Sequence, residues 1–465
     1  MTRKSEHGIS KLSPKLKIHD ISTDSRSIKK GDLFVALRGE KFDGHEFIYA
    51  VQKQGAIAAI VDEKWYRSAA KKKQTIKLPL LVVKNTLDSY GDLANIYRKK
   101  FSIPILLVAG SNGKTTMKEV ISHVLGTSFN VLKTEANYNN HVGLPRMLFR
   151  LRPNHEIAVL EIGTNHPGEI EWLTKCAEPT HGLITNIGRE HLEFFEDLKG
   201  VAKEELTLFD VLARKKGFIF INNDDKILAK EKKRFQGRNI SFAAKTKADV
   251  QSNDLGFSTN GQRNIEILIE TKRFQIVTHL IADYAPSLIA GTTAVASYFG
   301  LTSVEIKKAV NSYRPHSKRM EIVKFHGVTS IDDSYNANPE SFLAALETLK
   351  KMPVKGRKYV VAGDMFELGN TAEREHQLLG KAMATYKFGG YYFTGKAMKQ
   401  AFAALVNSNK NLHASYYSSK EDIVNALGSI LKKGDVILVK GSRGMKMETV
   451  IEQLRIRDHE PVFNS

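Results

Sequence analysis

The 465-residue sequence has a single cysteine, Cys176, and no uninterrupted apolar run near 18 residues. One cysteine excludes an internal disulfide and fits a reducing compartment, and the absence of Cys and His clusters argues against a structural zinc site. Residues 1–15 are polar and charged with no apolar stretch behind them, so the sequence shows neither a signal peptide nor a membrane span. We therefore expect a cytoplasmic protein without membrane insertion.

Low-complexity tracts and fixed-period repeats are also missing, which argues against disordered and solenoid architectures. The formal net charge of +20 suits nucleic acid, an anionic membrane surface or small polyanions such as nucleotides. The densest basic runs, Lys71–Lys73 and Lys230–Arg234, lack interleaved aromatic residues. They favour a solvated face over a nucleic-acid patch, so no nucleic-acid partner is expected.

The chain is longer than one hydrophobic core usually supports, and its pattern predicts an α/β fold of three domains. In residues 1–100, short apolar strands at Leu33–Leu37, Ala56–Val61 and Leu80–Val83 alternate with turn residues and one short helix. Pro104 then opens a new apolar run. The first domain is therefore predicted to be small and to end near residue 100.

Residues 101–314 are predicted to form the second domain. A strand at Ile105–Ala109 precedes a glycine-containing loop and a helix over about 115–125, and apolar strands recur at Ile157–Ile162, Gly182–Asn186 and Phe218–Asn222. This alternation predicts a mostly parallel sheet covered on both faces. Between residues 263 and 280, apolar and polar residues alternate, which predicts an antiparallel hairpin at the edge of that sheet.

The third predicted domain spans residues 315–465, where the β/α rhythm restarts with apolar strands near Ile331 and at 359–362, 391–394 and 436–439. Three polar, glycine-containing segments follow strands there: Asp332–Pro339, Gly363–Gly369 and Gly441–Glu448. Turn chemistry alone explains any one of them. Three such strand ends in one sheet favour a substrate site.

Gly110–Thr116, with the sequence Gly-Ser-Asn-Gly-Lys-Thr-Thr, is the strongest functional signal. It lies between a predicted strand and a predicted helix, where backbone N–H groups cradle phosphate, Lys114 neutralises it and Thr115 reaches Mg²⁺. The generic eight-residue pattern requires glycine at position 108, which is Val108 here, so the loop is a shorter variant. We interpret it as the phosphate-holding loop of an ATP-consuming enzyme.

Three further residues have both a functional and a structural interpretation. Glu161 ends an apolar strand, where it serves either as a magnesium ligand or as a simple strand cap. His191 follows another strand end, and a lone histidine is more often structural than a ligand. Lys203 lies on a helix predicted to begin near Leu198, where pairing with nearby glutamates is the simpler explanation.

Taken together, these segments resemble the Mur ligases of bacterial cell-wall synthesis over nearly the whole chain. The resemblance rests on the phosphate loop, on Asp332–Pro339, Gly363–Gly369 and Lys440–Glu448, and on shorter matches at Thr23–Arg26, Gly31–Leu37, Asn137–Asn140, Glu161–Gly163 and Asn165–Glu169. It implies an N-terminal UDP-binding domain, a central ATPase domain with a phosphate loop on a parallel sheet, and a C-terminal Rossmann-like domain. It also implies a monomer.

The resemblance implies an ATP-dependent peptide ligase that joins D-alanyl-D-alanine to UDP-N-acetylmuramoyl-tripeptide through an acyl phosphate, with ADP and phosphate as the other products. It assigns Lys114 to the ATP phosphates, Thr115 and Glu161 to one Mg²⁺, and His191 with a carbamylated Lys203 to a second. Other residues implied in nucleotide binding are Gly110, Ser111, Asn112, Gly113, Thr116, Asn139, Asn140, Arg319 and Asp333. Those implied in substrate binding are Ser25, Arg26, Asn165, His166, Asn336 and Asn338.

One position departs from the family. Its members carry two asparagines, three residues apart, at the start of the helix before the C-terminal domain, where this chain has Ala285 and Leu288. Each lost hydrogen bond costs about 0.5–1.5 kcal/mol, so ATP binding is expected to weaken by roughly tenfold. This departure leaves a second hypothesis open, a catalytically weakened relative that binds UDP-muropeptides as a sensor or scaffold. A third is a ligase of the same superfamily acting on folate or an amino-acid polymer.

Overall fold

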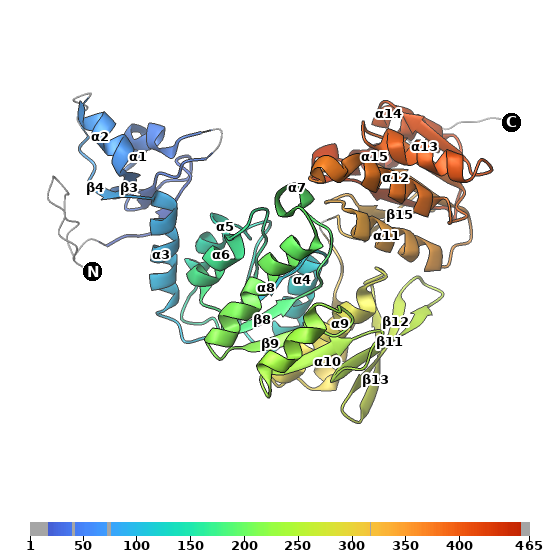
Figure 1. Ribbon diagram of the computed structural model, residues 1–465, viewed down its shortest axis with the longest axis horizontal. Coiled ribbons are helices and arrows are strands. Elements are labelled where there is room, and N and C mark those ends of the chain that lie inside the picture. Colours follow the sequence, from blue (N-terminus) through green and yellow to red (C-terminus); the bar gives the residue numbers. More distant parts are fainter. Residues whose placement is uncertain (1–16, 40–41, 72–75, 317, 457–465) are drawn as a thin grey trace.

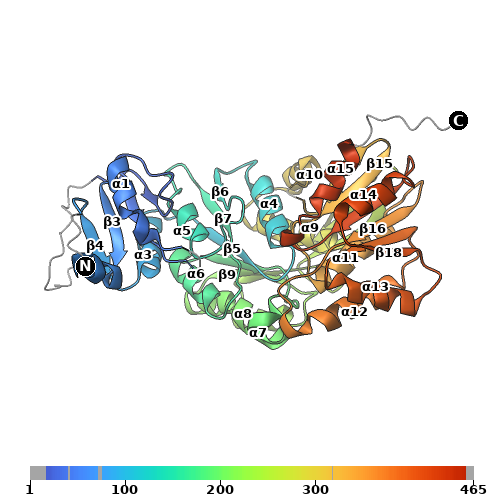
Figure 2. The same cartoon turned by 90° about the horizontal axis from the view of Figure 1, so that it is seen from above.

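Each third of the chain forms its own β-sheet, and the three parts follow one another along the molecule in chain order (Figures 1 and 2). The computed structural model describes residues 17–39, 42–71, 76–316 and 318–456. The predicted three-part α/β architecture is confirmed. No helix within these described ranges combines the length and the apolar character needed to cross a membrane.

The N-terminal sheet has four parallel strands in the order β1 (Ile21–Ser22), β2 (Leu33–Val35), β3 (Ala58–Asp62) and β4 (Leu80–Val83). Helices α1 (Ile48–Gln54) and α2 (Glu63–Lys71) connect its strands. Asn85 then caps α3 (Thr86–Arg98) by accepting the backbone N–H groups of Leu87 and Asp88. Helix α3 packs against α5 (Gly143–Leu148) and α6 (Glu169–Ala177), so it joins the first sheet to the central one (Figure 1).

The central sheet has nine strands in the order β13-β12-β11-β10-β9-β8-β5-β7-β6. Its parallel part comprises β5 (Ile105–Ala109), β6 (Val131–Lys133), β7 (Ile157–Glu161), β8 (His181–Ile184), β9 (Phe218–Asn222), β10 (Asn239–Ala243) and β11 (Val250–Phe257). The predicted edge hairpin is present as β12 (Arg263–Ile269) and β13 (Lys272–Thr278). Because β11 also pairs antiparallel with β12, the antiparallel edge has three strands.

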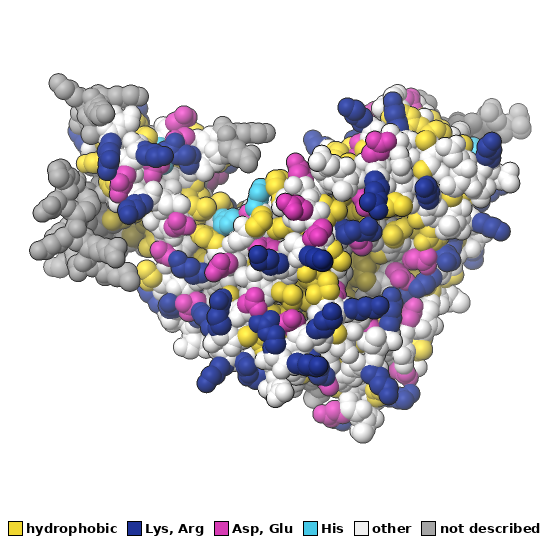
Figure 3. Space-filling view, in the orientation of Figure 1, with side chains coloured by type: hydrophobic (Ala, Val, Ile, Leu, Met, Phe, Trp, Pro, Cys, Tyr) yellow, Lys and Arg dark blue, Asp and Glu magenta, His cyan; other side chains and the backbone are white. Residues whose placement is uncertain are grey.

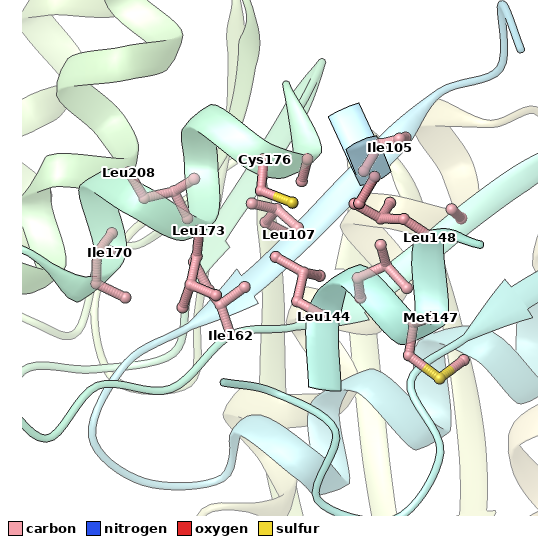
Figure 4. Packing of buried hydrophobic residues seen from close by; sticks show 14 of the residues in the cluster. Ile105, Leu107, Leu144, Met147, Leu148, Ile162, Ile170, Leu173, Cys176 and Leu208 are labelled. Carbon is pink, nitrogen blue, oxygen red and sulfur yellow. The ribbon is translucent and has the colours of Figure 1, made fainter. Parts of the chain in front are cut away.

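Alternate residues of β5 enter separate apolar clusters, as expected for a sheet covered on both faces. Ile105 and Leu107 pack with side chains of α5, α6 and α8 (Leu198–Arg214), including Leu144 and Leu208 (Figure 4). Leu106 and Val108 enter the other cluster, with helices α4 (Lys114–Leu125), α9 (Ala285–Tyr298) and α10 (Ser303–Ser312). Strand β5 is therefore a buried, rigid base for the loop that follows it.

The C-terminal sheet has the order β14-β15-β19-β16-β17-β18, and only β14 (Glu321–Phe325) runs antiparallel to its neighbour. The parallel strands are β15 (Val328–Asp333), β16 (Lys358–Ala362), β17 (Gly390–Thr394), β18 (Ala414–Tyr417) and β19 (Val436–Lys440). The helices are α11 (Pro339–Lys351), α12 (Ala372–Met383), α13 (Met398–Ser408), α14 (Lys420–Gly428) and α15 (Glu448–Ile456). Strands β15 and β19 are neighbours, so the polar segments that follow them lie side by side.

Candidate functional site

The phosphate loop leaves β5 at Gly110 and enters α4 at Lys114. Gly110 has φ +110°, and a Cβ atom there would lie 2.4 Å from the Thr185 hydroxyl oxygen. Gly113 also has positive φ, +80°, at the start of α4. These two positions require glycine because L side chains rarely adopt that conformation. The loop thus presents backbone N–H groups at a helix N-terminus, which is a favourable place for an anion.

A cavity of about 770 Å³ lies over this loop, between the central and C-terminal parts. It brings together most of the predicted site residues: Ser111, Asn112, Gly113, Lys114, Thr115, Asn139, Asn140, Glu161, Asn165, His166, His191, Arg319, Asp333, Asn336 and Asn338. Segments more than 200 residues apart in the sequence therefore meet at one site. Gly110 lies in the loop and Thr116 in helix α4. Neither is among the described residues that line the cavity.

Lys114 lies among acidic side chains at the base of the cavity. Its ammonium nitrogen is 3.3 Å from the Ser111 carbonyl oxygen and 3.4 Å from Glu190 Oε2. Burial disfavours the charged ammonium, but the carboxylates of Glu190, Glu205 and Glu161 outweigh that effect and raise the pKa of Lys114. Lys114 therefore keeps its positive charge where a phosphate would bind.

Glu161 ends β7 with its carboxylate beside the loop. Its Oε1 accepts hydrogen bonds from the Thr115 hydroxyl at 3.1 Å and from the Asn139 amide at 2.9 Å. Its Oε2 is buried and has no hydrogen-bond partner in the described part of the chain. A hydroxyl and a free carboxylate oxygen are the hard donors that Mg²⁺ prefers, so Thr115 and Glu161 fit that ion.

His191 immediately precedes the short helix α7 (Leu192–Phe195) and has a left-handed conformation, with φ +49°. Its Nδ1 lies 2.8 Å from Glu367 Oε2 of the C-terminal part, and this contact holds the pKa of Glu367 below its usual range. Within the ranges that the structure describes, no group of three or more His, Cys, Asp or Glu side chains converges as a metal site. Mg²⁺ usually takes one or two carboxylates and completes its shell with phosphate and water oxygens.

The C-terminal wall of the cavity is organised around Asp333. The buried Lys440 ammonium donates to Asp333 Oδ2 at 2.5 Å and to the Asn336 carbonyl oxygen at 3.0 Å, while the Met320 backbone N–H donates to Asp333 Oδ1. The Arg319 guanidinium lies 4.0 Å from the centre of the Tyr335 ring. This wall therefore presents a neutralised carboxylate beside the Arg319 guanidinium.

Two sets of polar contacts hold that wall against the phosphate loop. The Asn338 amide donates to Asn112 Oδ1 of the loop at 2.8 Å. Arg189 forms ion pairs with Glu340 at 2.8 Å and with Glu375 at 3.4 Å. The central and C-terminal parts are thus connected directly at the site.

Three predicted residues lie elsewhere. Lys203 is exposed on α8 and is not among the described residues that line the cavity. Ser25 and Arg26 lie in the turn after β1, also outside the cavity lining. Arg26 pairs with Asp24 at 2.8 Å, and this pairing lowers the pKa of Asp24 to about 2. The structure therefore separates the N-terminal candidates from the phosphate loop.

The start of α9 has the expected apolar character. Ala285 and Leu288 are both buried in the apolar cluster over β5, and Leu288 also lines the cavity. Neither side chain offers a hydrogen bond to a ligand. Tyr284 lies beside them, and burial raises the pKa of its hydroxyl to about 12.

Sequence reasoning missed three charged residues that shape the site: Glu190, Glu205 and Lys440. Glu190 precedes His191 and contacts Lys114. Glu205 lies on α8 and accepts the Gly110 backbone N–H at 2.8 Å. Each belongs to a segment already singled out in the sequence, and the apolar spacing of α8 places position 205 on its buried face.

The surface carries charged side chains of both signs (Figure 3). On the face shown in Figure 3, lysine and arginine side chains are scattered among acidic ones. The same face is hollowed between the N-terminal part and the rest of the molecule.

Comparisons with known proteins match nearly the whole chain to one family. Family models match residues 17–98 (Mur ligase family, catalytic domain), 108–294 (Mur ligase middle domain) and 318–443 (Mur ligase, glutamate ligase domain). Two similar proteins are the UDP-N-acetylmuramoyl-tripeptide–D-alanyl-D-alanine ligases of Bacillus subtilis and Escherichia coli, at 32% and 33% identity. Each alignment covers 94% of this chain and 93% of the relative.

Solved structures agree along the same length. A crystal structure of MurF from Acinetobacter baumannii superposes with a TM-score of 0.83 at 27% identity, covering 96% of this chain and 95% of that one. MurF from Thermotoga maritima in complex with ADP superposes with a TM-score of 0.81 at 26% identity, covering 96% and 98%. The phosphate loop, the three sheets and these alignments together show that the chain belongs to the Mur ligase family.

Proposed function

We propose that this chain is an ATP-dependent ligase that joins D-alanyl-D-alanine to UDP-N-acetylmuramoyl-tripeptide in bacterial cell-wall precursor synthesis. The observation that carries the proposal is the cavity lined both by the phosphate loop and by Arg319, Asp333 and Asn336 of the C-terminal part. The relatives that align over 94% of the chain are named as this ligase. The proposal includes a monomer acting in the cytoplasm.

The reaction needs two group transfers. An oxygen of the tripeptide carboxylate attacks the γ-phosphorus of ATP, the bond to the ADP oxygen breaks, and an acyl phosphate forms. The dipeptide amine then attacks the acyl carbon, loses a proton, and expels phosphate. Lys114 and the loop N–H groups would bind the transferred phosphoryl group in both steps, because they form the positive end of the cavity.

Thr115 and Glu161 are the residues that would hold Mg²⁺, since the Glu161 carboxylate lies beside the Thr115 hydroxyl and its Oε2 has no hydrogen-bond partner among the described residues. Bound there, Mg²⁺ would neutralise charge on the phosphate oxygens. Asn139 positions Glu161 by donating to its other oxygen. Lys203 is exposed on α8, so its place does not support a carbamylated ligand for a second ion.

The C-terminal wall would bind the reacting groups and exclude water from the acyl phosphate. Arg319 and Asp333 are assigned to nucleotide or dipeptide, and Asn336 and Asn338 to substrate. Asn165 and His166 line the cavity from the central part, and the acceptor peptide would lie against them. Ser25 and Arg26 remain assigned to the UDP end of the substrate, at a distance from the reacting carboxylate.

The sensor or scaffold hypothesis rests on Ala285 and Leu288 alone. The site retains Lys114, Glu161 and His191 around one cavity, and a binding protein would not need this phosphate-transfer set. The ligase is therefore the preferred function.

The test measures phosphate release by the full chain with ATP, Mg²⁺, UDP-N-acetylmuramoyl-tripeptide and D-alanyl-D-alanine, and omits each substrate in turn. We expect release to require all of them. Release that is independent of the dipeptide, or no release at all, contradicts the ligase. Binding of the UDP-tripeptide without turnover would favour the sensor hypothesis.

A further inference from the structure

Helix α8 presents Lys203 and Glu205 on opposite sides. Successive helix residues are rotated by about 100°, so residues two apart point in nearly opposite directions. Lys203 is exposed, whereas Glu205 is fully buried. The side chain that α8 directs toward the phosphate loop is therefore Glu205.

The Glu205 carboxylate has one engaged oxygen and one free oxygen. Oε2 accepts the backbone N–H of Gly110, the first residue of the phosphate loop, at 2.8 Å. Oε1 is buried without a hydrogen-bond partner in the described part of the chain. Burial and the neighbouring Glu190 raise the pKa of Glu205 although Lys114 opposes them, so the ionised carboxylate lacks sufficient positive charge beside it. A buried carboxylate with an open oxygen calls for a positive group beside it.

Two neighbouring glutamates resemble Glu205 in having one unsatisfied carboxylate oxygen. Glu161 Oε2 and Glu190 Oε1 are also buried without hydrogen-bond partners among the described residues. Three carboxylates therefore surround one ammonium, that of Lys114. A bound nucleoside triphosphate would add further negative charge, so this arrangement requires cations that enter with the nucleotide.

We propose that Glu205 is a divalent-cation ligand of the phosphate site and supplies, as an encoded side chain, the carboxylate that a carbamylated Lys203 was expected to supply. Metal binding and turnover then need neither CO₂ nor bicarbonate. The inference rests on the proposed function only in taking ATP as the nucleotide that brings the cation. It makes Lys203 a solvated surface residue.

The competing explanation is that Glu205 only braces the loop through Gly110. Glu205→Gln separates the two roles, because the amide oxygen still accepts the Gly110 N–H while the negative charge is lost. A brace role predicts unchanged metal binding for this variant. A ligand role predicts weakened metal binding in a loop that remains folded.

The experiment measures Mn²⁺ binding to the full chain by electron paramagnetic resonance, with a non-hydrolysable ATP analogue, in CO₂-free buffer and again with bicarbonate. We expect Glu205→Gln to lose one tight Mn²⁺ or to bind it about tenfold more weakly or worse. We expect Lys203→Ala to stay within about twofold of the unsubstituted protein, with no bicarbonate effect in either.

Unchanged Mn²⁺ binding in Glu205→Gln would overturn the proposal. So would loss of Mn²⁺ in Lys203→Ala, or in the unsubstituted protein when CO₂ is removed. The last two arms leave Glu205 intact, so they decide the question even if Glu205→Gln fails to fold. Because Mn²⁺ binding is measured without turnover, failure of the ligase assay and failure of this proposal are distinguishable.

Discussion

Replacing Lys440 by methionine removes the ammonium that neutralises Asp333 and keeps most of the apolar side chain. The two side chains are only 2% and 13% exposed, and their charged atoms are 2.5 Å apart. At an effective dielectric constant of about 20 this separation corresponds to an attraction of about 6–7 kcal/mol, much of it offset by desolvation. Breaking a buried pair on one side typically costs about 3–5 kcal/mol. We expect about 3 kcal/mol, because Asp333 keeps the Met320 N–H.

The assay must report on the C-terminal part alone. Both tryptophans, Trp65 and Trp172, lie outside it, so intrinsic tryptophan fluorescence does not follow its unfolding. Hydrogen exchange by mass spectrometry on peptides from β15 and β19 does. A loss of about 3 kcal/mol corresponds to roughly 100-fold faster exchange of their most protected amides.

A double variant separates stability from function. Adding Asp333→Asn to Lys440→Met removes the unpaired buried charge, so we expect protection to recover by more than half while ligase activity stays low. Exchange in the single variant within about threefold of the unsubstituted protein would refute the energetic reasoning. Recovery of activity in the double variant would refute the role of Asp333 in the site.

Four further predictions concern Lys114, Arg189, His181 and Leu288. Lys114→Met should lower kcat/KM for ATP about 100- to 1000-fold in steady-state assays, whereas the half-exposed control Lys133→Met should change it less than about twofold. Arg189→Ala removes the ion pairs that connect the two cavity walls, so phosphate released per ligated product should rise above one, and a ratio of one would contradict that role. Burial lowers the pKa of His181 to about 4, below its unfolded value near 6.5, so the unfolded chain binds the extra proton between these values. The free energy of unfolding should therefore fall as pH drops from about 6.5 to 4, and His181→Phe should flatten that slope in urea titrations. Leu288→Asn should lower the KM for ATP about two- to tenfold, and an unchanged KM would show that this position does not face the nucleotide.

The phosphate loop and the strands around it could be predicted because their signals are local. A continuous apolar run at Ile105–Ala109 and the glycines after it define a strand, a turn and a helix start within a dozen residues. The predicted C-terminal strands also lie where expected, since each is a short apolar run. Boundaries moved by one or two residues, as for β8, which starts at His181 rather than Gly182.

The charged pairs of the site could not be predicted, because their partners are distant in sequence. Lys440 meets Asp333 only because β19 lies beside β15 in the C-terminal sheet. Glu190 meets Lys114 only because β8 and β5 are neighbours. The sequence therefore places Glu190 and Lys440 next to functional motifs, but their partners follow only from the order of the strands in the sheets.

Lys203, rather than Glu205, was predicted as a metal ligand for a reason unrelated to strand order. The family resemblance predicts a role for the lysine. The spacing of Val201, Leu208 and Leu212 on α8 instead indicates that position 205 faces inward. The helix face decides which side chain reaches the site. Residue type alone does not.

The central claim is that the tripeptide carboxylate is activated by phosphoryl transfer from ATP before the dipeptide amine attacks. The most direct test uses UDP-N-acetylmuramoyl-tripeptide labelled with ¹⁸O in the reacting carboxylate and follows the released phosphate by mass spectrometry. Transfer of one ¹⁸O into phosphate, in step with formation of the dipeptide-extended product, is the predicted result. Product formed with unlabelled phosphate, or labelled phosphate without product, would contradict the account.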